Sequence, residues 1–137
     1  MDNAPKIWYP GDRKHVIIQI SNNCNNDLNR AVFEVAHEAI HCLSPTGQSS
    51  ANVLEEGLAN LFSIAYSSEN GHGAWTSDDA RYTFASEQVK ALLFIDADII
   101  KQLRKIQPTI SLIDETLIRK VNPNVPGTLA AKLTQPF

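Results

Sequence analysis

The chain has 137 residues, 43% of them hydrophobic, which suits one ordinary globular domain, so we expect a single domain over residues 1–137. Its 12 Lys and Arg residues are scattered and its formal charge is −3. This charge distribution lacks the basic patch by which a protein binds nucleic acid or an anionic membrane, and it favours a protein or small-molecule partner. No apolar run approaches the roughly 18 residues of a membrane span, and the N-terminal residues lack a signal-peptide layout, so we expect a cytoplasmic protein. Two cysteines, Cys24 and Cys42, are expected to be free thiols.

The first predicted elements are short strands. Residues 7–9 favour β structure and end at a Pro-Gly-Asp turn signal. Residues 15–21 form the strongest strand pattern, in which Val16, Ile18 and Ile20 alternate with more polar residues and should cover a core. An Asn-rich cluster follows, and we expect a helix to begin at about Asn26 or Asp27.

The helix predicted over residues 28–43 carries a His-Glu-x-x-His motif. Apolar residues recur along it at helical spacing, and Ser44-Pro45 with Gly47 ends it. His37 and His41 are four residues apart, so they project from one helix face and can bind one metal ion. Glu38 lies where a carboxylate can accept a proton from water without being a ligand. The alternative interpretation is two partly buried histidines beside a solvated glutamate.

A second predicted helix, residues 51–66, offers the third ligand that a catalytic zinc site needs. Its apolar stripe, namely Leu54, Leu58, Leu61 and Ala65, could pack on the first helix, and the short loop over residues 44–50 favours an antiparallel pair. In such a pair, Glu55 and Glu56 lie at about the same position along the helix axes as His41. A site formed by two histidines and one of these glutamates is therefore possible.

At this point residues 31–63 resemble the gluzincin branch of the zincin metallopeptidases. Glu55-Glu56-Gly57-Leu58-Ala59 is similar to the Asn-Glu-Gly-Phe-Ala segment of the aminopeptidase-like members, in which the Glu before Gly binds zinc. The resemblance therefore implies metal ligands His37, His41 and Glu56, and Glu55 would replace the Asn of that segment. The simpler interpretation of Glu55 is a solvated carboxylate on the outer face of the helix, and the sequence alone does not decide between Glu55 and Glu56 as third ligand. Only 14 residues separate His41 from Glu56 and accessory domains are lacking, so the chain looks like a minimal gluzincin module. The segment is also similar to small HExxH proteins that cleave phage repressors or regulate radiation responses.

The resemblance implies a mechanism that these residue types support. Zn²⁺ held by two imidazoles and a carboxylate would lower the pKa of its water and polarise a peptide carbonyl, while Glu38 acts as general base. Zincin folds also place an edge strand beside the cleft, and residues 15–21 are the candidate for it. The motif contains no stabiliser for the oxyanion; candidates downstream are His72, Arg81 and Tyr82.

The rest of the chain predicts helices. Residues 77–107 read as one long helix or two, a further helix runs through Val121, and a last short turn surrounds residues 129–133. We therefore expect an α+β, mainly α, zincin-like fold, with a small N-terminal β-sheet packed on the HExxH helix and a C-terminal helical bundle.

The function predicted is a zinc-dependent metallopeptidase, a hydrolase of peptide bonds acting on a peptide or protein substrate. One alternative is a zinc-binding regulatory or sensing module that cleaves one specific partner or is inactive. Another is a helical interaction protein with a fortuitous motif. The substrate, the choice between endo- and aminopeptidase, and the oligomeric state are not determined by the sequence.

Overall fold

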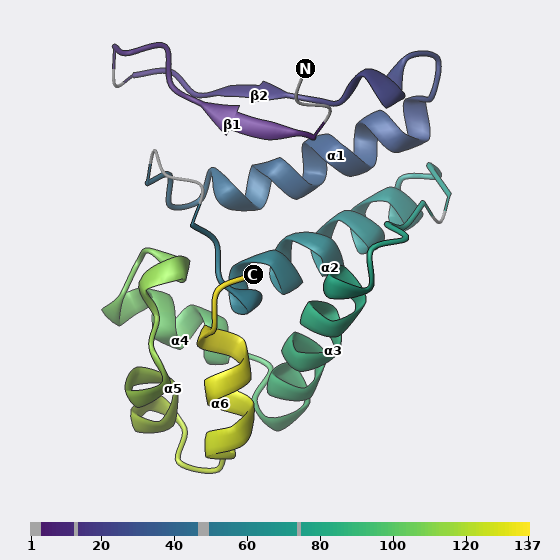
Figure 1. The fold of residues 1–137 in the computed structure, drawn as a ribbon. Helices are drawn as coiled ribbons and strands as arrows, with labels where there is room; N and C mark the ends of the chain where they lie inside the picture. The colour runs from purple at the N-terminus through teal and green to yellow at the C-terminus, as the bar shows by residue number, and fades with distance from the viewer. Residues whose placement is uncertain (1–3, 13, 47–49, 74) are drawn as a thin grey trace. The chain divides into compact units, whose positions relative to one another are not determined.

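The computed structural model describes residues 4–12, 14–46, 50–73 and 75–137, and part of the predicted 44–50 loop, including Gly47, lies outside them. The protein is mainly helical with a small antiparallel sheet (Figure 1), as the sequence predicts. Within the described residues no helix combines the length and the apolar character that a membrane span requires. The backbone forms two compact units, residues 1–47 with 59–78 and residues 48–58 with 79–137, and the single-domain organisation stays a prediction.

The first unit contains the sheet and the HExxH helix. Strands β1 (Lys6–Trp8) and β2 (Ile17–Gln19) pair antiparallel, with Trp8 opposite Ile17, and both strands contact helix α1 (Leu28–His41). Strand β1 begins one residue earlier than predicted, and β2 is shorter than the predicted residues 15–21. Ile18 and Ile20 are half-buried but Val16 is 39% exposed, so only part of the expected apolar face covers a core.

Helix α1 begins where the sequence predicts, because the Asp27 side chain accepts a hydrogen bond from the backbone N–H of Arg30 and caps the helix. The helix ends at His41. Its buried face differs from the expected apolar stripe, since Leu28 is 67% exposed whereas three of its polar residues are buried with Phe33 and Ala36, namely Glu34, His37 and Glu38. Buried polar side chains require partners, so this face indicates a site rather than a plain core.

Helix α2 (Val53–Glu69) begins after Asn52, whose side-chain oxygen accepts a hydrogen bond from the backbone N–H of Glu55 at 2.9 Å. Leu54 is buried as expected, but Ala65 is exposed, so the predicted apolar stripe is wrong for the later turns. There the buried residues are small or polar: Ala59, Asn60, Ser63 and Ser67. The hydroxyl of Ser63 is satisfied within the helix, because it donates to the carbonyl of Ala59.

The second unit contains the remaining helices. The predicted segment 77–107 is two helices, α3 (Ala80–Ile95) and α4 (Ile99–Ile106), separated at Asp96, whose carboxylate accepts a hydrogen bond from the Asn122 side chain. Helices α5 (Glu115–Val121) and α6 (Gly127–Thr134) pack on each other, α6 on α3, and α5 on α4. Short 3₁₀ turns cover Asn22–Cys24 and Ile110–Leu112.

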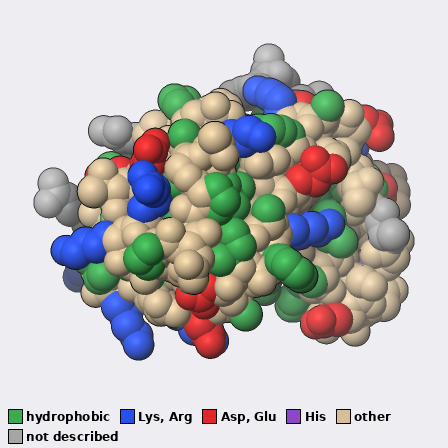
Figure 2. All heavy atoms as spheres, turned by 90° about the horizontal axis from the view of Figure 1, so that it is seen from below, with side chains coloured by type: hydrophobic (Ala, Val, Ile, Leu, Met, Phe, Trp, Pro, Cys, Tyr) green, Lys and Arg blue, Asp and Glu red, His purple; other side chains and the backbone are tan. Residues whose placement is uncertain are grey.

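The core of this unit is aliphatic, with fully buried side chains from every helix, among them Leu54, Leu92, Ile99, Leu103, Ile118 and Leu133. Lys and Arg are interspersed with Asp and Glu on the face that Figure 2 shows. Residues 135–137 form backbone hydrogen bonds with the chain just before α2 and at its first residue: the N–H of Val53 donates to the carbonyl of Gln135, and the N–H of Phe137 donates to that of Ala51. The chain end therefore lies at the start of α2 (Figure 1).

Candidate metal centre

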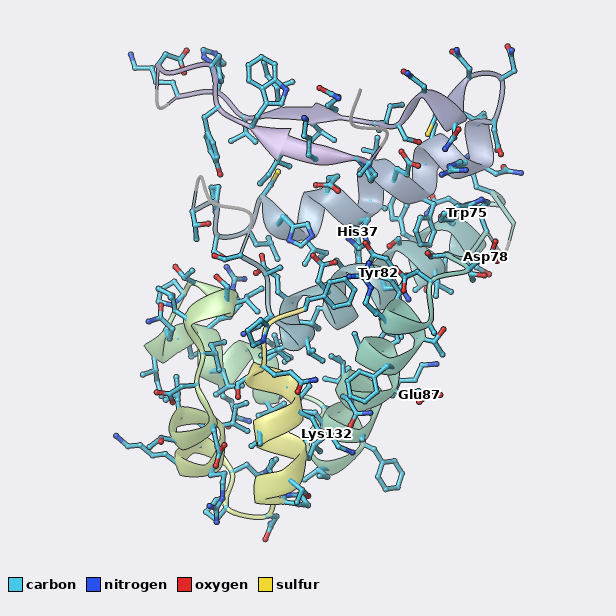
Figure 3. All side chains as sticks on the ribbon, in the orientation of Figure 1. His37, Trp75, Asp78, Tyr82, Glu87 and Lys132 are labelled. Atoms are coloured by element: carbon cyan, nitrogen blue, oxygen red, sulfur yellow. The ribbon has the colours of Figure 1, made fainter. Side chains whose placement is uncertain are left out.

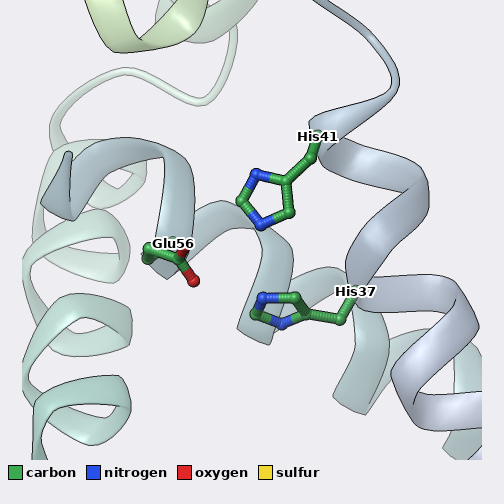
Figure 4. Close-up of side chains that lie close together, drawn as sticks. All are labelled: His37, His41 and Glu56. Carbon is green, nitrogen blue, oxygen red and sulfur yellow. The ribbon is translucent and has the colours of Figure 1, made fainter. Parts of the chain in front are cut away.

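Three of the predicted site residues lie together in the structure. One ligand atom from each of His37, His41 and Glu56 lies within 4.8 Å of the other two. The two imidazole rings have centroids 5.2 Å apart, and they face the Glu56 carboxylate (Figure 4). This is the only group of three or more His, Cys, Asp or Glu side chains of such geometry among the described residues. The structure therefore contains a His-His-Glu group that could hold a metal ion.

The four-residue spacing on α1 explains how the two histidines meet, because residues i and i+4 lie one above the other on a helix. His37 is 6% exposed and His41 is half-buried. Phe33, one turn earlier on α1, has its ring centroid 6.5 Å from that of His37 and 4.5 Å from that of Trp75, in a T-shaped arrangement with Trp75. Figure 3 labels His37 and Trp75. Sequence reasoning did not identify Trp75, which follows a Gly-rich loop without a helical pattern.

Glu38 directly follows His37 on α1. Its side chain is 5% exposed, although the alternative interpretation of the motif required a solvated glutamate. Cys42 follows it by one turn, and the pKa of that thiol is raised, first by burial and then by the negative charge of Glu38. Cys42 is half-buried and is a free thiol, as is Cys24. A buried carboxylate directly beside a potential ligand suits a proton acceptor at the site.

Glu34 belongs to a hydrogen-bond network that fixes α1 to the end of the strand region. Its carboxylate accepts bonds from the backbone N–H and the hydroxyl of Ser21, both at 2.7 Å, and from Nε of Arg30 at 2.9 Å. Burial raises the pKa of Glu34, but these hydrogen bonds outweigh burial and hold the pKa below its usual value. The Arg30 guanidinium also lies over the Trp75 ring at 4.9 Å. The network reaches the turn of α1 that precedes His37 and Glu38.

The two candidate glutamates of α2 have different environments. Glu56 is half-buried and belongs to the group with the histidines, whereas Glu55 is not part of that group. Glu55 is 6% exposed, which corrects the expectation of a solvated residue on the outer face. The burial arises because Glu55 lies in the first turn of α2, beside the buried residues Asn52 and Leu54. The structure therefore favours Glu56 as the third ligand.

The donor set fits a small divalent cation. A point at the centre of a triangle with 4.8 Å sides lies about 2.8 Å from each corner, whereas Zn²⁺ bonds to nitrogen and oxygen are about 2.0–2.2 Å. Side-chain shifts of less than about 1 Å would bring the three ligands to bonding distance. Two imidazoles and one carboxylate with an open fourth position are the ligand set of catalytic zinc sites. The residues present thus suit zinc, although the geometry alone does not identify the metal.

The candidates for oxyanion stabilisation occupy different surroundings. Arg81 and Tyr82 lie in the first turn of α3, and Tyr82 packs its ring 4.9 Å from that of Phe137. The Asp79 carboxylate raises the pKa of Arg81, and Tyr82 and Glu56 add smaller contributions of the same sign, so Arg81 lies within the electrostatic reach of Glu56. His72 is half-buried in the turn after α2, where its N–H donates to the carbonyl of Ser67. Arg81 is held by Asp79, whose carboxylate accepts a hydrogen bond from Nη2 at 2.6 Å.

Comparison of the chain with models of known protein families, with curated proteins and with solved structures gives no match.

Proposed function

We propose that this protein is a zinc-dependent peptidase of a minimal gluzincin type. The observation that carries the proposal is the meeting of His37, His41 and Glu56, with ligand atoms within 4.8 Å of one another, beside a buried Glu38. The three side chains supply the neutral nitrogen and anionic oxygen donors that zinc prefers. A zincin-like fold is part of this proposal, and its support is the packing of the small sheet on the HExxH helix.

The proposed reaction is hydrolysis of a peptide bond. Zinc bound here would lower the pKa of a water toward neutrality and polarise the substrate carbonyl. Glu38 is the general base: it accepts the proton of the attacking water and later donates it to the leaving amine. The burial of Glu38 keeps the carboxylate in one place and strengthens its electrostatic interactions with the reacting groups.

We place Arg81 first among the candidates to stabilise the carbonyl oxygen as it becomes negative, since it is a permanent cation on α3, the helix whose backbone lies against Gly57, next to Glu56. Tyr82, the next residue on α3, and His72 remain the other candidates. An extended peptide could add to the sheet, because each of β1 and β2 pairs with only one partner among the described strands. These assignments are part of the proposal.

The test compares zinc-loaded wild type with Glu38→Gln on a mixed peptide library, with products identified by mass spectrometry. Loss of a general base lowers the rate by about 10²–10⁴-fold, so we expect kcat to fall by at least 10²-fold with zinc retained. Glu69→Gln, at the end of α2 on an exposed residue, is the matched control and should keep full activity.

Equal hydrolysis by wild type and Glu38→Gln would contradict the assigned mechanism. Cleavage of one partner protein but of no library peptide would instead favour the regulatory alternative. Zinc binding without any hydrolysis would favour an inactive zinc-binding module.

A further inference from the structure

A pocket of about 340 Å³ opens in the second unit, between the start of α2, the start of α3 and the chain end. Its walls are Val53 of α2, three residues of α3, namely Ala80, Arg81 and Phe84, and residues 135–137. Most of this lining is apolar. Two backbone polar groups at the chain end already have hydrogen-bond partners: the carbonyl of Gln135 accepts from Val53, and the N–H of Phe137 donates to Ala51.

The pocket adjoins the proposed third metal ligand. Val53 precedes Glu56 by three residues, and residues three apart on a helix are neighbours on one face. On the facing wall, the pocket residues of α3 precede Ala85, whose backbone lies against Gly57, the residue after Glu56. A group bound in this pocket would therefore lie next to the carboxylate that we assign to the metal.

The chemistry of the walls indicates what the pocket receives. The charge of Arg81 is offset by Asp79, which accepts hydrogen bonds from Nε and from Nη2, the latter at 2.6 Å. The guanidinium also lies over the Phe137 ring at 5.1 Å, so it covers an aromatic face rather than forming an isolated cationic site. Aromatic and aliphatic walls favour an apolar group, and the volume is sufficient for a leucine or phenylalanine side chain.

We infer that this pocket binds an apolar side chain of the peptide substrate, at a residue flanking the cleaved bond, and so sets the sequence preference of the peptidase. The inference rests on the proposed function. Ala80 and Phe84 are the specificity-determining residues, because they line the pocket and lie outside the metal group.

Ala80→Phe tests this inference. Ala80 is exposed at the first position of α3, so a larger side chain can enter the pocket without disturbing the core. The experiment measures kcat/KM for zinc-loaded protein on peptides that differ at one position, with Gly, Ala, Leu or Phe. We expect wild type to prefer Leu and Phe by at least about tenfold at one position, and Ala80→Phe to lose that preference while still cleaving the Gly peptide. Ala91→Phe, an exposed alanine later on α3, is the matched control and should behave as wild type.

A second readout does not depend on turnover. Calorimetry on zinc-loaded Glu38→Gln should show the Leu peptide binding at least about tenfold more tightly than the Gly peptide, and this difference should disappear in Glu38→Gln with Ala80→Phe. A preference that Ala80→Phe leaves unchanged, or the absence of any apolar preference, would overturn the pocket assignment while the peptidase proposal stands. Cleavage of no peptide would overturn both.

Discussion

Glu34 and Glu38 are both buried on α1, one turn apart, but their surroundings give them different roles. Glu34 accepts hydrogen bonds from Ser21 and Arg30 and fixes the backbone after β2 to the helix. Glu38 lies beside His37 and raises the pKa of the Cys42 thiol, second to burial. The neighbours of each carboxylate, and not its residue type, therefore separate a structural residue from a proposed general base.

Glu34→Gln should destabilise the protein, because Ser21 and Arg30 then lose an ionised partner at a buried position. Because the Arg30 side chain is partly exposed, we expect a loss of about 1–3 kcal/mol in the free energy of unfolding, measured in urea at pH 7. Because the folded-state pKa of Glu34 lies below its ordinary value of 4.5, the stabilisation is present above that pH and is lost as the pH falls through the folded-state pKa.

The difference in stability between wild type and Glu34→Gln should therefore shrink below about pH 4.5. The exposed Glu87→Gln on α3 serves as the control, with little change at any pH. A difference that stays constant between pH 7 and pH 3 would show that the ionised form of Glu34 is not what stabilises the fold.

Among the elements, α2 depends most on a single small residue. A Cβ atom built on Gly57 would lie 2.5 Å from the backbone carbonyl oxygen of Ala85 and 2.6 Å from Cγ2 of Val89, both on α3. The absent side chain thus permits close approach of the two helices next to Glu56. The contact with Ala85 is to backbone, so it cannot be relieved by a change of rotamer.

Gly57→Ala should lower the free energy of unfolding by about 1–3 kcal/mol, because α3 has to move away from α2. It should also weaken metal binding, since Glu56 precedes Gly57. Gly127→Ala is the matched control: its added Cβ would meet the Arg119 guanidinium at an ordinary 3.7 Å, and the helix should be as stable as before or more so. Equal stabilities for Gly57→Ala and Gly127→Ala would refute this role of the close contact.

The helices show which structural features local sequence patterns can predict. Asp27 as the cap of α1 and the shared face of His37 and His41 follow from local rules, and both are confirmed. The apolar stripe predicted on α2 is confirmed at Leu54 but fails at Ala65, which is exposed. Helical periodicity also does not reveal that Ser63 can be buried when its hydroxyl bonds within the helix. The hydrogen bond between Ser21 and Glu34 joins residues 13 positions apart, and no local sequence pattern predicts it.

At the scale of the whole molecule, the proposed centre depends on contacts between distant parts of the sequence. Residues 48–58 belong to the same compact unit as residues 79–137. The start of α2 is bonded to the chain end, and Gly57, next to Glu56, lies against α3. The spacing of 14 residues between His41 and Glu56 made a shared site possible without determining it. The pocket could not be predicted either, since its walls come from residues 53, 80–84 and 135–137.

The central claim is that α1 and α2 together supply one zinc site. The most direct test is the zinc content of the purified protein by inductively coupled plasma mass spectrometry, with far-UV circular dichroism to verify folding. We expect one equivalent of zinc for wild type, Glu38→Gln and Glu55→Ala, and loss of zinc in His37→Ala, His41→Ala and Glu56→Ala. Folded wild-type protein that binds no zinc would contradict the claim, and loss of zinc in Glu55→Ala but not in Glu56→Ala would contradict the choice of third ligand.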